Sequence, residues 1–100
     1  MKEVLNAPMQ ENDANAETIG DYLIKLLLTL WSKGDGFSGK RPFGNSGWEH
    51  DLYYALVKNN HIKGKIDDEY GDLIDYDRAE GDKIIFECIR SLYTEQTNNG

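Results

Sequence analysis

The chain has 100 residues, the size of one ordinary domain with a single hydrophobic core. Hydrophobic residues make up 39% of the sequence and charged residues 29%, and an aromatic content of 11% argues against a disordered chain. The formal net charge of -7 argues against general nucleic-acid binding, because such proteins gain affinity when Lys and Arg neutralise phosphates.

The single cysteine, Cys88, excludes an internal disulfide and a multi-cysteine zinc site, and it is typical of a reducing compartment. The first residues lack the apolar run of a secretory signal peptide. The most apolar stretch, residues 19–31, contains Asp21 and Lys25 and is shorter than the roughly 20 residues that a membrane span needs. We therefore expect a protein of the cytoplasm that does not associate with membranes.

Both ends of the sequence are polar. Residues 1–17 and residues 94–100 show no apolar period. Segments of this kind have no apolar face to bury, so they are commonly loose in solution. We predict a flexible N-terminal arm over 1–17, one folded helical domain over 18–93 and a flexible tail over 94–100.

A first helix is predicted to follow Thr18. Thr18 and Asp21 match a capping box, in which the two side chains accept hydrogen bonds from unpaired backbone N–H groups. The apolar positions that follow are spaced by three and four residues, as on one side of a helix: Ile19, Tyr22, Leu23, Leu26, Leu27, Leu30 and Trp31. Lys33 and Gly34 favour a helix end at that point.

A second helix is predicted after residue 46, where Ser46 and Glu49 repeat the capping pattern. Its apolar face is formed by Trp48, Leu52, Ala55 and Leu56, and it is widened by Tyr53 and Val57. The helix should end near Asn59 and Asn60, because asparagine tolerates the left-handed conformation that is common at helix ends.

The helical period is lost over residues 62–76. Ile62 and Ile66 flank a short Lys-Gly-Lys sequence, an acidic run follows, and Leu73 and Ile74 form an apolar pair. A small β-hairpin and an irregular connection both fit this pattern, and we favour the hairpin.

A third helix is predicted to begin at residues 77–80, where Asp77 provides a cap. Its apolar positions are Ile85, Cys88, Ile89 and Leu92, with Phe86 and Tyr93 beside them. The sequence therefore predicts a mainly α fold: a compact three-helix domain with a long Gly-rich loop after the first helix and a small β-hairpin before the third.

The charges are unevenly distributed along the chain. Residues 1–33 carry a net charge of -2, residues 34–65 carry +2 and residues 66–100 carry -7. The most concentrated acidic surface is expected at Asp67, Asp68, Glu69 and Asp72. This surface could be a solvated face that partly neutralises the middle third, or it could recruit a basic partner or mimic nucleic acid.

The Gly-rich loop, residues 34–46, is longer than most connections between helices. Lys40 and Arg41 are expected near its tip, and Asn45 and Ser46 lead into a helix N-terminus that attracts anions. With Trp48 as a stacking face, these residues could hold a phosphate, a carboxylate or a nucleotide, or contact a partner protein. Each also has a structural role available, such as capping by Ser46 or core packing by Trp48.

Two familiar motifs in this loop are rejected. Residues 34–39 match G-x-G-x-x-G, but they follow a helix and not a strand, so the dinucleotide-binding context is missing. Residues 34–40 match G-x-x-x-x-G-K, but Arg41 stands where a phosphate-binding loop needs Ser or Thr for magnesium.

No other catalytic or metal-binding pattern emerges from the sequence. His50 and His61 are not spaced as metal ligands with Cys88, and the acidic run does not fit the calcium-binding loop of an EF-hand. Cys88 falls on an apolar stripe and is expected to be a core residue. We therefore predict a protein that is not an enzyme and has neither a metal nor a cofactor.

The run from Trp31 to Trp48, together with residues 51–53, 62–64 and 67–71, resembles a group of small phage and prophage proteins of unknown function. The most specific part is residues 37–48, with the sequence FSGKRPFGNSGW, and the resemblance spans residues 18–93. It implies a phage or mobile-element origin and a place in the host cytoplasm, and it implies no catalytic residues.

Two functions follow as hypotheses. The first is a non-enzymatic, acidic, phage-type interaction module that binds or antagonises a host or phage protein through the Gly-rich loop or the acidic C-terminal third. The second is a small-anion or nucleotide-binding protein that uses Lys40, Arg41 and the start of the second helix.

Overall fold

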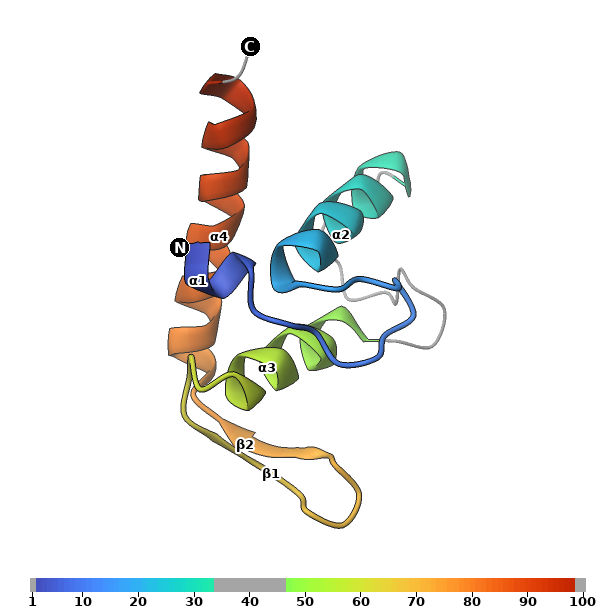
Figure 1. The fold of residues 1–100 in the computed structure, drawn as a ribbon, viewed down its shortest axis with the longest axis vertical. Coiled ribbons are helices and arrows are strands. Elements are labelled where there is room, and N and C mark those ends of the chain that lie inside the picture. Colours follow the sequence, from blue (N-terminus) through green and yellow to red (C-terminus); the bar gives the residue numbers. More distant parts are fainter. Residues whose placement is uncertain (1, 34–46, 99–100) are drawn as a thin grey trace.

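The computed structural model describes residues 2–33 and 47–98. In that part of the chain it contains four helices and one antiparallel hairpin (Figure 1). The elements are α1 (Lys2–Leu5), α2 (Ile19–Lys33), α3 (Trp48–Lys58), β1 (Gly64–Ile66), β2 (Leu73–Tyr76) and α4 (Arg78–Asn98). The mainly helical fold and the hairpin before the last helix are confirmed, and the short α1 is an addition.

Two of the predicted helix caps are present as hydrogen bonds. At the start of α2, the backbone N–H of Asp21 donates to Thr18 Oγ1 over 3.1 Å, and Asp21 Oδ2 accepts from the backbone N–H of Glu17 over 3.2 Å. At the start of α4, the backbone N–H of Glu80 donates to Asp77 Oδ1 over 3.1 Å. Local polar side chains therefore set where both helices begin.

The cap of α3 differs from the predicted one. The helix begins at Trp48 with Gly47 at the N-cap, which has no side chain to accept a bond, and Ser46 lies outside the described residues. At the other end, Asn59 is the C-cap and Asn60 has a φ of 62°, the left-handed conformation that the pair of asparagines predicted.

The core lies where α2, α3 and α4 meet. The largest fully buried side chains come from all three helices: Ile19, Tyr22, Leu23 and Leu26 from α2, Leu52 and Leu56 from α3, and Cys88 from α4. The predicted apolar stripes therefore form the core, except that the side chains of Leu30 and Trp31 lie outside the described residues. Phe86 and Tyr93 differ from the prediction, because they are 64% and 74% exposed.

A buried hydrogen bond joins α2 to α3 inside this core. The hydroxyl of Tyr22 donates to Asp51 Oδ2 over 2.7 Å, and Asp51 is only 7% exposed. A buried carboxylate is costly unless it accepts hydrogen bonds, so this contact fixes how the two helices face each other.

The N-terminal segment is packed against the helices, where the composition predicted a flexible arm. Val4, Ala7 and Ala16 are buried, and Pro8 pairs with Thr18 as an isolated β-bridge. The apolar residues of this segment are few and irregularly spaced, so no helical or strand period marked them. The folded unit therefore begins near residue 2.

Side-chain amides tie this segment to α3. Asn59 Nδ2 donates to the carbonyl of Pro8 over 3.0 Å, and Gln10 Nε2 donates to the carbonyl of Asp51 over 3.2 Å. At the other end of the chain, α4 continues to Asn98, through residues that were expected to form a tail.

Removing residues 2–17 should destabilise the protein. The deletion uncovers the surface under Val4 and Ala7 and removes both amide contacts, so we expect a loss of about 2 kcal/mol or more and a fall in Tm of roughly 10 °C. Differential scanning calorimetry of the two chains measures this shift.

A pair of point variants separates packing from chain length. Val4→Asp should lower Tm, whereas Glu3→Ala, at an exposed neighbour, should leave it within about 2 °C. An unchanged Tm for both the deletion and Val4→Asp would show that the segment is loose in solution.

Candidate functional site

Four of the five predicted loop residues, Lys40, Arg41, Asn45 and Ser46, lie outside the described part of the chain. The fifth, Trp48, is the first residue of α3 and is half-buried against the core. Its packing agrees with a structural role. Anion binding by the Gly-rich loop stays a prediction.

The second predicted surface is the acidic hairpin, defined here as residues 64–77. Its strands pair with Gly64 opposite Tyr76 and Lys65 opposite Asp75, and the register shifts between Lys65 and Ile66. Such a shift is typical of a β-bulge, which bends and twists the local strand.

The turn that joins the strands is held by backbone hydrogen bonds. The N–H of Asp67 donates to the carbonyl of Asp72, and the N–H of Gly71 donates to the carbonyl of Asp67, each over 2.7 Å. Asp67 Oδ1 also accepts from the N–H of Glu69 over 3.0 Å. Gly71 has a φ of 70°, which glycine adopts without strain. The turn therefore has a defined shape.

The acidic hairpin carries six carboxylates and one lysine. Of the predicted acidic surface, Asp68, Glu69 and Asp72 are exposed, whereas Asp67 is half-buried and shapes the turn. In the described residues, no ion pair involves these four carboxylates. Within the same described ranges, no ion pair joins a cation of the basic middle third to a carboxylate of the acidic third, and the pair between Arg78 and Glu49 has the opposite arrangement of charges.

Two apolar side chains stand among these carboxylates. Tyr70 is 74% exposed and Ile74 is 65% exposed. Sequence reasoning missed both as surface residues, because Tyr70 lay in a run that was assessed for charge and Ile74 was noted only as part of an apolar pair. The signal available in the sequence was an aromatic residue within a turn-rich acidic run.

The base of the acidic hairpin is anchored by Tyr53 of α3. The Tyr53 ring stacks on Tyr76 of β2 with 4.9 Å between ring centroids, and the Tyr53 hydroxyl donates to Asp82 Oδ1 of α4. Ile66 and Leu73 also pack against the core. The tip of the hairpin points away from α4 (Figure 1).

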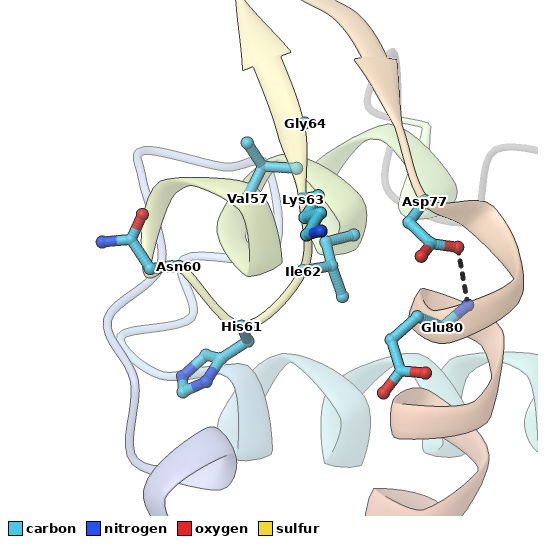
Figure 2. A pocket seen from close by; sticks show the side chains of 8 residues that line it. All are labelled: Val57, Asn60, His61, Ile62, Lys63, Gly64, Asp77 and Glu80. Carbon is cyan, nitrogen blue, oxygen red and sulfur yellow. Dashed lines mark hydrogen bonds between the residues drawn. The ribbon is translucent and has the colours of Figure 1, made fainter.

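Beside this base lies an open depression of about 600 Å³. Figure 2 shows Asn60 and His61 on one side of it and Asp77 and Glu80 on the other, with Ile62 and Lys63 between them. The Asp77 carboxylate already caps α4. These side chains do not converge on one point, so the depression does not form a built pocket for a small ligand.

The described residues, 2–33 and 47–98, hold no group of three or more His, Cys, Asp or Glu side chains that could bind a metal ion. No helix in those ranges is both long enough and apolar enough to cross a membrane. Cys88 is fully buried, and burial raises the pKa of its thiol to about 11.

No protein-family model matches the chain, and no curated protein and no solved structure gives a match. The resemblance of residues 37–48 to phage proteins therefore stays a prediction.

Cys88 should be almost inert toward a thiol reagent in the folded protein. At pH 8 a thiol of pKa about 11 is ionised in roughly one molecule in 1,000, against about one in ten at the ordinary pKa of 9.0. The reaction with Ellman's reagent should therefore be at least about 100-fold slower in the native state than in guanidinium chloride. Equal rates would show that the thiol is accessible.

Gly81→Ala should lower stability. A Cβ at Gly81 would lie 2.5 Å from Tyr53 Cε1, and this ring is already held by Tyr76 and Asp82. At an unobstructed helix position, Gly→Ala would instead stabilise by about 1 kcal/mol. We expect urea unfolding to show a loss of about 1–3 kcal/mol, and a gain in stability would contradict the anchoring role of Tyr53.

Proposed function

We propose that the chain is a non-enzymatic protein-interaction module that contacts its partner through the acidic hairpin. The observation that carries the proposal is the exposure of Tyr70 and Ile74 among carboxylates that form no ion pair in the described residues. Tyrosine is a common anchor of protein contact sites, and polar groups commonly form the rim around such an anchor. The charge of the acidic hairpin calls for a basic surface on the partner.

The rigidity of the hairpin supports this role. Hydrogen bonds shape its turn, and Tyr53 and Tyr76 fix its base. A preformed contact surface loses less conformational entropy on binding than a flexible segment does. Only the exposed side chains of the tip then need to be ordered in the complex.

Charge favours a basic protein as the partner. The acidic hairpin has six carboxylates against one lysine, and it belongs to a chain with a net charge of -7. Such a field attracts a basic surface and speeds association, whereas it repels the phosphates of nucleic acid. The resemblance to phage proteins favours a host or phage protein in the host cytoplasm.

Binding of a small anion or nucleotide is the alternative predicted from the sequence. It depends on Lys40 and Arg41, outside the described residues, and on the start of α3, where Gly47 provides no side-chain ligand. Interaction through the acidic hairpin is therefore the function that the described residues support best.

Photo-crosslinking in cells that express the protein tests the proposal. Benzoylphenylalanine in place of Tyr70 should crosslink to a protein with a basic surface, identified by mass spectrometry. The matched control carries the same group in place of Leu28, which is 66% exposed on α2, and should not give this product.

A second comparison tests the role of charge. The neutralised variant Asp68→Asn, Glu69→Gln, Asp72→Asn should reduce the Tyr70 crosslink by about tenfold, since three exposed charges are removed from the contact. Equal products at positions 70 and 28, or a product that contains nucleic acid, would overturn the proposal.

A further inference from the structure

The outward face of α4 carries a second set of exposed side chains. We call these residues the α4 stripe: Lys83, Phe86, Arg90 and Tyr93. They are spaced by three, four and three residues in the sequence. At about 100° per residue these positions fall within an arc of about 80° on the helix. All four residues are exposed, and the apolar side of α4, with Ile85 and Cys88, faces the core.

The two cations of the α4 stripe are not engaged with neighbouring carboxylates in the described residues. Lys25 pairs with Asp21, and Arg78 pairs with Glu49 and Asp82, but no ion pair involves Lys83 or Arg90. The stripe thus carries two cations and two aromatic side chains on an acidic protein, and Glu87 lies at its edge. Phe86 is 64% exposed and Tyr93 is 74% exposed, so the stripe places two large aromatic side chains on the same face as its two cations.

We infer that the α4 stripe binds the acidic hairpin of a second copy of this chain, head to tail. Lys83 and Arg90 complement the carboxylates of Asp68 and Glu69. Tyr70 and Ile74 on one copy and Phe86 and Tyr93 on the other supply apolar surface to bury in the same contact. The inference rests on the proposed function of the acidic hairpin, and it names a partner surface for it.

The contact forms between copies and not within one. The base of the acidic hairpin is fixed beside the first turns of α4 by Tyr53, Tyr76 and Asp82, and its tip points away from that helix (Figure 1). The tip of one copy therefore cannot fold back onto its own α4 stripe. Because two different surfaces meet, the association is heterologous and can extend beyond two copies.

Net charge opposes this association only at long range. Each copy has a charge of -7, but at about 0.15 M salt charges separated by more than roughly 8 Å are largely screened. Opposite charges in contact keep a larger share of their attraction. At that salt concentration, the ion pairs in the contact therefore determine whether two copies associate.

Sedimentation equilibrium of the purified full-length chain tests the inference through charge reversal. The hairpin variant is Asp68→Lys with Glu69→Lys, and the stripe variant is Lys83→Glu with Arg90→Glu. The wild type should show an average mass that rises above 11.4 kDa with concentration. Each variant alone should weaken this self-association by tenfold or more, because its one reversed surface now meets a surface of the same charge.

Two combinations of these substitutions should restore association. A mixture of the two variants should associate, and so should the chain that carries all four substitutions, because opposite charges face each other again. The fourfold chain keeps the net charge of -7, while the hairpin variant has -3 and the stripe variant -11, since each pair of reversals changes the charge by four. Circular dichroism and Tm confirm that each variant is folded.

The net charges make the outcome decisive. If overall repulsion controlled the assembly, the hairpin variant at -3 would associate more strongly than the wild type, and that result would overturn the inference. A mass of 11.4 kDa for the wild type at all concentrations up to about 1 mM would also overturn it. In that case, a crosslink from position 70 to a different protein would still support the proposed function of the acidic hairpin, although the chain would not associate with itself.

Discussion

The arrangement of the acidic hairpin against the helices depends on one side chain, the Tyr53 phenol. It comes from α3, stacks on Tyr76 of β2 and donates a hydrogen bond to Asp82 of α4. Three elements that are separate in the sequence are therefore held by a single ring, and Gly81 leaves the space that the ring occupies. Without this contact, the acidic hairpin would be joined to the helices mainly by Ile66 and Leu73, and a two-stranded hairpin is only marginally stable by itself.

The same elements present one face to the core and another to solvent, and the outward faces are the ones proposed to bind. In α4, Ile85 and Cys88 face the core, while the side chains of the α4 stripe face water. In the acidic hairpin, Ile66 and Leu73 pack inward and Tyr70 and Ile74 stand outward. Substitutions on the outward faces can therefore change binding with little effect on folding, which makes the contact surfaces separable by mutation.

Local signals in the sequence were sufficient for most of the fold. Thr18 and Asp77 mark helix starts because each cap is a contact between residues three apart, and the paired asparagines mark the end of α3 for a similar reason. The N-terminal segment was not predictable in this way. Its burial depends on contacts such as Asn59 to Pro8, which join residues far apart in the chain and leave no period in the sequence.

The candidate site was predictable only in part. Charge counting located the acidic run, because charged residues near one another in sequence remain near one another in a turn. It did not show that Tyr70, Ile74 and Phe86 are exposed, since exposure depends on the face that each element presents to the core. The cationic side chains of the α4 stripe were also hidden, because the surrounding third of the chain is strongly acidic.

The shifted register between Lys65 and Ile66 has a consequence for solubility. A flat two-stranded sheet with an exposed isoleucine would be a template for further strands, and stacking of such edges is the usual route to aggregation. A bulge interrupts the regular ladder and twists the strand, and the neighbouring carboxylates repel an identical strand aligned beside it. The hairpin can thus expose Tyr70 and Ile74 to solvent while its strand edges discourage amyloid-like growth.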